Sequence, residues 1–164
     1  MIALKNVLVA TDFGDAADMA LTYGRELART FGAKLHVLHV VQDLGVYMGA
    51  PEYSTSVGRL QVEVEESARA RANQLVSDED RQVLRAEVTV LTHPSAAQAI
   101  VGYARDARID LVIAGTHGRG RVAKLIMGSV AEKVARTAPC PVLVVRHPER
   151  EFVLPDALQT VAHA

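Results

Sequence analysis

The sequence predicts an α/β protein with one domain, in which a five-stranded parallel sheet carries helices on both faces. Three observations predict this class. Five short apolar runs alternate with segments of helical periodicity, as in parallel sheets with crossover helices. The chain has 164 residues, about the length of one domain. No internal repeat or interdomain linker is visible between these segments.

The expected strands are the five apolar runs. Residues 6–11 (NVLVAT) form a continuous apolar run, which is typical of a strand buried on both faces. The remaining strands are expected at 34–41 (KLHVLHVV), 85–91 (RAEVTVL), 110–114 (DLVIA) and 141–146 (PVLVVR).

The expected helices are recognised by apolar residues at three- and four-residue steps. From Asp15 to Phe31 these steps mark one apolar face, and Gly32 is suited to end the helix. Ser95 is expected to cap a later helix. The other helices are expected at 60–75, 96–104 and 130–135.

Two segments fall outside this pattern. Residues 42–58 are polar, contain Gly and Pro, and are long for a loop in a compact domain, so we expect a functional or mobile loop. Residues after His147 are weakly patterned. The chain is therefore divided into a domain at 1–147 and a C-terminal tail at 148–164.

Composition and charge narrow the class of partner. Nearly half of the residues are apolar (49%), and the formal net charge is −1, so nucleic acid is not expected as the primary partner. Cys140 is the only cysteine, which excludes an intrachain disulfide and points to the reducing cytoplasm. The first apolar run ends at Asp12, too short to span a membrane, so it is interpreted as a strand.

One glycine-rich segment carries the chemistry. Residues 115–132 read GTHGRGRVAKLIMGSVAE, between an expected strand and an expected helix. Glycines allow backbone amides to converge on a phosphate, and a helix start adds unpaired amides and the positive end of the helix dipole. The hydroxyl of Ser129 and the cationic residues Arg119, Arg121 and Lys124 add further groups. The segment therefore favours an anion site.

A structural interpretation of the same residues stays open. Gly115 can simply close a strand, and Ser129 with Glu132 can form a capping box that satisfies helix amides. The segment is neither a P-loop, because no Gly-Lys-Ser/Thr occurs, nor the dinucleotide Gly-x-Gly-x-x-Gly.

The order Gly-x2-Gly-x9-Gly-Ser resembles the ATP-binding signature of the universal stress protein family. The resemblance covers roughly residues 4–147 and includes the stretches VLVATDF, LHVLHVV, DLVIAGTHGRG, GSVAEKVAR and APCPVLVVR. It implies a Rossmann-like fold of the adenine nucleotide alpha hydrolase-like type. It also implies ATP as ligand, with Mg²⁺ or Mn²⁺, and a homodimer formed through the last strand, Pro141 to Arg146.

The resemblance also implies roles for individual residues. Ala10 and Thr11 would line the base with their backbone, Asp12 would lie near the adenine and ribose, and Val40 would pack on the adenine. Ala10 stands where some members have proline. Ala114 stands where methionine is common, and its contact would be mainly through the backbone. The phosphate- and ribose-contacting positions would be Gly115, Gly118, Gly128, Ser129 and Val130, with His117 and Arg119 in the same loop.

Other residues have structural alternatives. Asp12 can equally cap the first helix or bond locally in a turn. His36 and His39 are three apart in a strand, so they point to opposite faces and are expected to be structural. A metal cluster of His93, His117 and His147 has no support from the sequence, and Cys140, between two prolines, is expected to be a packed thiol.

Three functions remain open at this point. The first is an ATP-binding regulatory protein of the stress response. The second is a slow ATPase or phosphotransferase, for which Asp12, His117 and Ser129 are the few candidate catalytic groups. The third is a ligand-free dimeric interaction module that uses the last strand at a sheet edge.

Overall fold

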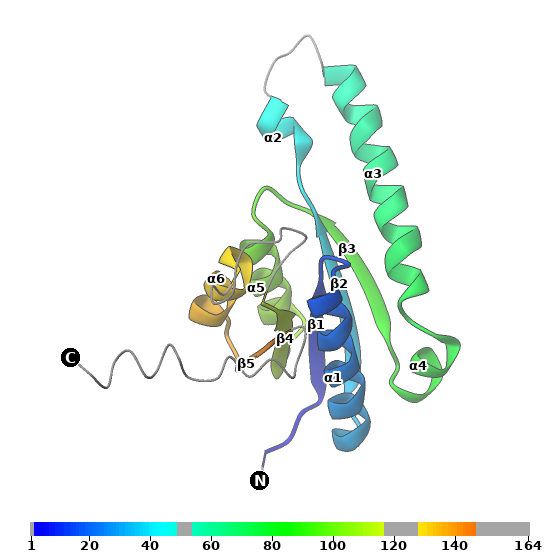
Figure 1. Ribbon diagram of the computed structural model, residues 1–164, viewed down its shortest axis with the longest axis vertical. Helices are drawn as coiled ribbons and strands as arrows, with labels where there is room; N and C mark the ends of the chain where they lie inside the picture. The colour runs from blue at the N-terminus through cyan, green and yellow to red at the C-terminus, as the bar shows by residue number, and fades with distance from the viewer. Residues whose placement is uncertain (1, 49–53, 117–127, 147–164) are drawn as a thin grey trace, which may run out of the picture.

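Five parallel strands form one sheet in the computed structural model, which describes residues 2–48, 54–116 and 128–146 (Figure 1). The order across the sheet is β3-β2-β1-β4-β5. This order reverses between β1 and β4, and such reversals create a crevice at the carboxyl ends of the strands. The strands are β1 (Asn6–Thr11), β2 (Lys34–Val41), β3 (Glu87–Thr92), β4 (Leu111–Gly115) and β5 (Val142–Val145).

Helices cover both faces of the sheet, as predicted (Figure 1). On one face lie α1 (Asp15–Phe31) and α3 (Ser54–Gln74), and on the other α5 (Ala96–Asp106) and α6 (Ser129–Thr137). The short helix α2 (Leu44–Met48) packs on α3, and α4 (Asp78–Val83) connects α3 to β3.

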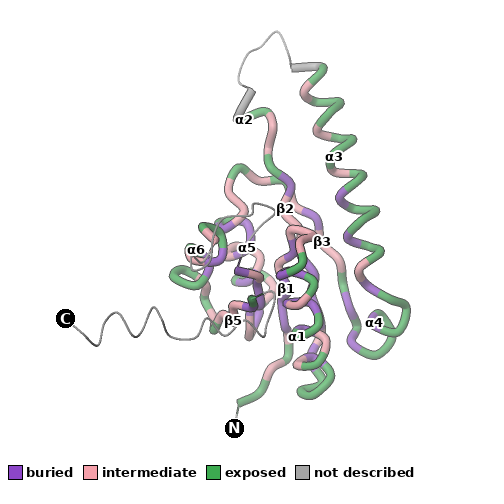
Figure 2. The backbone as a smooth tube through the Cα atoms, viewed as in Figure 1, coloured by how far each residue is buried: buried purple, intermediate pink, exposed green. Residues whose placement is uncertain are grey.

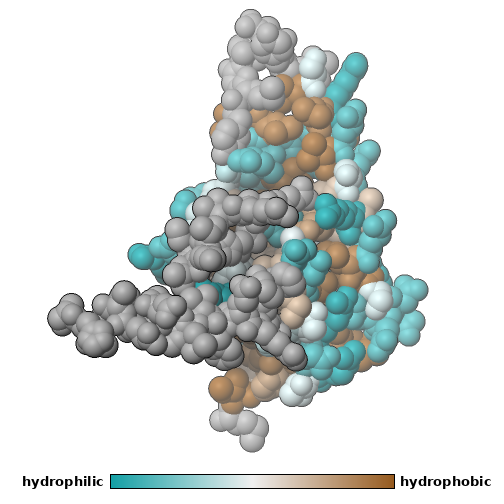
Figure 3. Space-filling model, viewed as in Figure 1, coloured by the Kyte–Doolittle hydropathy of each residue, from teal (hydrophilic) through white to brown (hydrophobic). Residues whose placement is uncertain are grey.

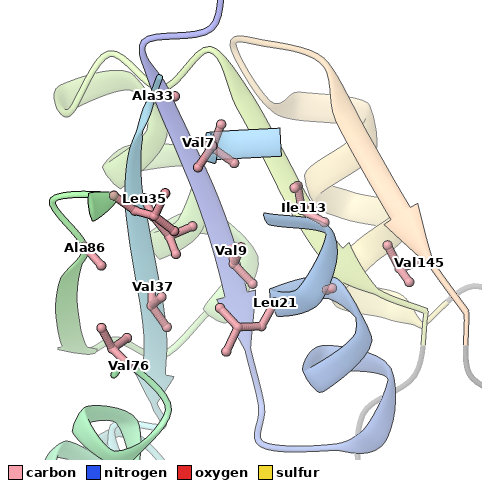
Figure 4. Close-up of a cluster of buried hydrophobic side chains, with 13 residues drawn as sticks. Val7, Val9, Leu21, Ala33, Leu35, Val37, Val76, Ala86, Ile113 and Val145 are labelled. Carbon is pink, nitrogen blue, oxygen red and sulfur yellow. The ribbon is translucent and has the colours of Figure 1, made fainter. Parts of the chain in front are cut away.

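The core is divided by the sheet because successive strand residues point to opposite faces. On β1, Val7 and Val9 belong to the cluster beneath α1, whereas Leu8 belongs to the cluster beneath α5 and α6. Figure 4 shows the first cluster, where Leu35 and Ile113 join them from the neighbouring strands. The buried segments in Figure 2 follow the strands and the inner faces of the helices.

A carboxylate fastens the start of the central strand. Asp110 Oδ2 accepts hydrogen bonds from the backbone amides of Lys5 (2.7 Å) and Asn6 (2.8 Å), which are more than a hundred positions earlier in the chain. The amide of Asp110 in turn donates to the carbonyl of Asn6 (2.9 Å). These bonds align β1 beside β4 and so place the carboxyl ends of both strands at one edge.

The segment between β2 and β3 differs most from expectation. Residues 42–58 were predicted to be a loop, but α2 lies within this segment and α3 begins at Ser54 rather than at position 60. The helix α4 was also not predicted, so the described residues contain six helices instead of four. Its sequence, DEDRQV, is almost wholly polar, and it is formed by a capping box of Ser77 and Asp80 rather than by an apolar face.

Smaller differences concern strand ends. β3 covers Glu87–Thr92 rather than 85–91, because Arg85 has a positive φ of 51°, which a strand cannot accommodate. β4 ends at Gly115, one residue later than expected, and this residue pairs with Val145. β5 is shorter than 141–146. The predicted tail, 148–164, lies outside the described residues and stays a prediction.

The helix α3 is longer than the sheet is high. Its 21 residues span about 31 Å at 1.5 Å per residue, and Figure 1 shows its first half extending with α2 beyond the carboxyl edge of the sheet. Leu60, Val62 and Val64 are exposed there, and Figure 3 shows apolar side chains on that part of the surface. Among the residues that the structure describes, no helix is long and apolar enough to cross a lipid bilayer.

A cluster of hydrogen-bonded polar side chains lies beneath α5. His36 is buried, with Nδ1 2.9 Å from the Tyr103 hydroxyl and Nε2 3.4 Å from Asn6 Oδ1. The Tyr103 hydroxyl also lies 3.4 Å from Thr89 Oγ1. Burial lowers the pKa of His36, and the charge of Lys34 lowers it further against the opposing effect of Glu87. The imidazole is therefore held in its neutral form.

This environment predicts a pH-dependent stability. Because the pKa of His36 is lower in the folded than in the unfolded state, the unfolded state binds more protons below about pH 6.5. The stability that the fold gains from a neutral His36 is fully present above that pH. It is lost as the pH falls toward the pKa of His36 in the folded state. Urea unfolding of wild type and His36→Gln at pH 7.5, 6.5 and 5.5 should show a smaller loss in the variant. An identical pH dependence of both proteins would contradict this prediction.

Candidate functional site

A pocket of about 370 Å³ opens at the carboxyl ends of β1 and β4. It is lined by the ends of three strands and by residues of α1, α5 and the start of α6. Many of the residues expected at a site line it, namely Ala10, Thr11, Asp12, Val40, Ala114, Gly115, Gly128, Ser129 and Val130. The pocket thus brings together residues from segments that are far apart in the sequence.

Three expected residues cannot be placed. His117, Gly118 and Arg119 lie outside the described residues, as do the neighbouring cations Arg121 and Lys124. Their proposed roles therefore rest on the sequence alone.

The pocket also contains residues that sequence reasoning missed. They are Ala17, Leu38, His39, Ala96, Ile100, Thr116 and Ala131. Two of them had a detectable signal: Leu38 is two positions from Val40 and so shares its face of β2, and Ile100 lies on the apolar face of its helix. The others follow from the contact between strand ends and helix starts, which no local pattern specifies.

The loop after β1 is held by its own side chains. Thr11 Oγ1, which is buried, accepts from the amide of Phe13 (3.0 Å), and Asp12 Oδ1 accepts from the amide of Gly14 (3.0 Å). The second bond is the local turn that was one alternative for Asp12. The other alternative, capping of α1, is wrong because the N-cap residue is Gly14.

At the end of β4, glycine is required by a close approach. A Cβ built on Gly115 would lie 2.8 Å from the backbone carbon of Ala16, in the first turn of α1. Gly115 therefore has a packing role in addition to lining the pocket. The backbone carbonyl of the next residue, Thr116, accepts a hydrogen bond from the amide of Gly128, which ties the end of β4 to the start of α6.

The start of α6 differs from the capping box that the sequence allowed. The carbonyl of Gly128 accepts from the amide of Glu132 (2.9 Å), so Gly128 is the N-cap and Ser129 is the first helical residue. Glu132 instead pairs with Arg136 at 3.2 Å. Gly128 has φ −57° and ψ 145°, which any residue can adopt, so the backbone conformation does not explain a glycine here.

This helix start gives the pocket one polar end. The first amides of a helix have no partner within it, and the helix dipole makes this end positive. Ser129 and Val130 are both exposed and both line the pocket. Leu38, Val40 and Ile100 give the same pocket an apolar lining.

Beside the pocket, three side chains form a stack on the loop after β1. The rings of Phe13 and His39 are 4.2 Å apart between centroids, and the Arg71 guanidinium lies 4.5 Å from the centroid of the Phe13 ring. Arg71 Nη2 also donates to the carbonyl of Phe13 (3.3 Å). His39 Nδ1 must donate to the carbonyl of Thr11 (2.8 Å), because a carbonyl can only accept.

The three histidines that the structure describes, and Cys140, each have partners within the protein. His36 and His39 point to opposite faces, as predicted, and each has polar partners. His93 Nδ1 accepts from the amide of Ser95 (2.9 Å). Within the described ranges, no group of three acidic, histidine or cysteine residues is arranged to hold a metal ion. Burial raises the pKa of the Cys140 thiol, as expected of a packed thiol.

Comparisons with known proteins agree with this architecture. The model of the universal stress protein family matches residues 3–146. A universal stress protein from Thermus aquaticus, encoded 3' of a QAH/OAS sulfhydrylase, is 34% identical over 142 residues, which cover 87% of this chain and 98% of that protein. UspA from Lactobacillus plantarum has a similar structure, with a TM-score of 0.70, 25% identity and coverage of 89% of this chain and 100% of its own.

Two more distant structures share the fold and contain a nucleotide. A universal stress protein in complex with cAMP has a TM-score of 0.56 and 24% identity, with 88% of this chain and 98% of that chain covered. A universal stress protein from Archaeoglobus fulgidus in complex with dAMP has a TM-score of 0.55 and 20% identity, with 88% and 99% covered.

Proposed function

This chain belongs to the universal stress protein family, and on that premise we propose that its pocket binds ATP and that ATP occupancy regulates a signalling role in the stress response. The observation that carries the proposal is the pairing of an apolar wall with a helix start inside one pocket. Leu38, Val40 and Ile100 offer a surface for a base, and the first turn of α6 offers amides for phosphates.

The size and chemistry of the pocket fit a nucleotide. Its volume of about 370 Å³ falls in the range of pockets that hold small ligands and cofactors. In the proposed pose, Val40 packs on the adenine, and Ala10 and Thr11 line the base. Asp12 lies at the ribose. Gly115, Gly128, Ser129 and Val130 contact ribose and phosphates, with Gly118, His117 and Arg119 contributing from the glycine-rich loop, and Ala114 contributing through its backbone.

The glycine at the start of α6 supports this pose. Glycine is a favoured N-cap residue even where the backbone conformation does not require it, as at Gly128, and the absence of a Cβ also leaves room for a phosphate to approach the backbone. Two members of the fold with bound cAMP and dAMP, both adenine nucleotides, add support for this class of ligand.

We infer that Mg²⁺ or Mn²⁺ would arrive with the nucleotide. Asp12 is the one acidic residue among those that line the pocket in the described part of the chain. Mg²⁺ is commonly held by one or two carboxylates together with substrate phosphates. A cation carried mainly by the triphosphate is therefore consistent with these donors.

The proposed assembly is a homodimer through the last strand. β5 is the final strand in the sheet order, so one of its edges is not paired within the described sheet. Val142–Val145 carries apolar residues on both faces, and such an edge is suited to pair with a second copy. Sedimentation of the nucleotide-free and ATP-loaded protein tests whether the dimer depends on the ligand.

The binding test compares wild type with Gly128→Val. Isothermal titration of nucleotide-free protein with ATP and Mg²⁺ should show saturable binding to wild type. The valine side chain would stand between the helix amides and the phosphate. Loss of even one hydrogen bond to a charged group, about 1.5–3 kcal/mol, corresponds to a more than tenfold weaker affinity.

The matched control is Gly58→Val on α3, where a Cβ has no neighbour within 4 Å. This variant should bind ATP like wild type. Absence of binding by nucleotide-free wild type would refute ATP binding altogether. Equal affinity of Gly128→Val and wild type would refute the placement of the phosphates at α6.

A further inference from the structure

A strained residue lies next to the pocket. Phe13 has a φ of 64°, in the left-handed region that bulky side chains rarely occupy. It follows Thr11 and Asp12, which line the pocket, and precedes Gly14, the N-cap of α1. Strain of this kind persists only where the surroundings impose it, and it is concentrated at functional sites.

The surroundings that impose it come from two other elements. β2 contributes His39, whose ring stacks on Phe13 and whose Nδ1 binds the carbonyl of Thr11. α3 contributes Arg71, whose guanidinium lies over the Phe13 ring and donates to the carbonyl of Phe13. Phe13 also packs against the small buried cluster that includes Ala68 and Ala72 of α3.

These contacts fix the backbone on both sides of Asp12. The carbonyl of Thr11 is held by His39, and the amide of Phe13 is held by Thr11 Oγ1. With the bond from the amide of Gly14 to Asp12 Oδ1, the carboxylate has a set orientation at the rim of the pocket. The loop would not keep this conformation by its own preference, because Phe13 is strained.

We infer that Phe13, held by His39 and Arg71, is a positioning residue that orients Thr11 and Asp12 toward the nucleoside part of the ligand. This inference rests on the proposed function. It makes α3 a support of the nucleoside end of the site, although none of the pocket-lining residues that the structure describes belongs to α3. The phosphate end depends on α6 and is independent of the stack.

The test separates the two ends of the ligand. Titrations with ATP and with inorganic tripolyphosphate are compared for wild type, Phe13→Leu, Phe13→Tyr, Arg71→Gln and the control Arg69→Gln. Arg69 is exposed on the same helix and its replacement removes the same charge. Each protein is titrated at a temperature at which urea unfolding shows it to be fully folded.

The expected result is at least fivefold weaker binding of ATP to Phe13→Leu and Arg71→Gln, with tripolyphosphate bound as by wild type. Phe13→Tyr keeps the ring and should retain the affinity of wild type, as should Arg69→Gln. A parallel loss for tripolyphosphate would overturn the inference, because the stack would then act on the whole fold.

Unchanged ATP affinity of Phe13→Leu and Arg71→Gln beside normal binding by wild type would overturn the inference alone. Absence of ATP binding by wild type would overturn the proposed function and this inference together. The two failures are therefore distinguishable.

Discussion

Replacement of Asp80 by alanine is expected to lower the free energy of unfolding by about 3 kcal/mol. The carboxylate is almost fully buried and accepts from Arg25 Nε (3.1 Å) and Arg25 Nη2 (2.9 Å) and from the amide of Ser77 (3.0 Å). Its loss leaves the guanidinium of Arg25 without its ionic partner and opens the capping box of α4. The side chain of Arg25 keeps 29% exposure, so the lower end of the range for buried pairs applies.

The pKa of Asp80 is consistent with this role. Burial alone would raise it, but the hydrogen bonds from Arg25 and Ser77 outweigh burial and hold the pKa below its usual range. A folded-state pKa below the unfolded value of about 3.9 means that this stabilisation is present above that pH and is lost as the pH falls toward the folded-state pKa.

Urea unfolding measures the effect, and Asp78→Ala is the matched control. Asp78 is exposed in the same first turn of α4, so its replacement should change stability by no more than about 0.5 kcal/mol. The double variant Arg25→Met/Asp80→Leu should recover part of the loss, since it leaves no unpaired charge. A loss below about 1 kcal/mol for Asp80→Ala would show that Arg25 is solvated well enough without its partner.

The second large effect is expected at Gly24, in the middle of α1. A Cβ at this position would lie 2.3 Å from Cγ2 of Val9, and Val9 is fully buried and stiff at χ1. Gly24→Ala should therefore lower the free energy of unfolding by about 1–3 kcal/mol through overpacking, although alanine is the better helix former.

Gly102→Ala on α5 is the matched control, because a Cβ there has no neighbour within 4 Å. The same change should raise the free energy of unfolding by about 0.5–1 kcal/mol, through helix propensity alone. Opposite signs for the two alanine variants are the expected outcome of thermal or urea unfolding. Stabilisation by Gly24→Ala would mean that α1 can move away from β1 at little cost.

The sequence was most informative where an apolar run or one apolar helix face is buried against the rest of the fold. The strands 6–11 and 34–41 and the helix from Asp15 to Phe31 have the predicted bounds. The two strands are continuous apolar runs, and the helix ends at Gly32, which has a φ of 64° and for which glycine is suited. In these elements local preference and burial agree.

Prediction was weakest where tertiary contacts form the element. The helix α4 depends on Arg25, some fifty positions earlier in the chain, and no local pattern reports such a partner. The first residues of α3, at 54–59, read STSVGR and contain Val57 as their only large apolar residue, so they could not be told from a loop. The extent of the 42–58 loop was overestimated for this reason.

For the candidate site, the alternation of strands and helices along the sequence was sufficient to predict which strand ends meet. It could not predict which contacts hold the side chains at those ends. The reversal of strand order places Asp12 and Gly115 at one edge, as parallel-sheet topology requires. The stack of Phe13 on His39 and Arg71 joins three separate elements and depends on a left-handed backbone angle that is unusual for phenylalanine. No pattern of residue types in the sequence predicts a positive φ at a phenylalanine.

The bonds from Asp110 to the start of β1 have a consequence for how the chain is made. Their partners are 105 residues apart, so at roughly 5–20 residues per second the ribosome needs about 5–20 s between them. During that interval β1 can pair with β2, but its other edge has no partner strand until β4 has been synthesised. The nascent chain therefore exposes the edge of what becomes its central strand, the stage at which a holding chaperone would matter most.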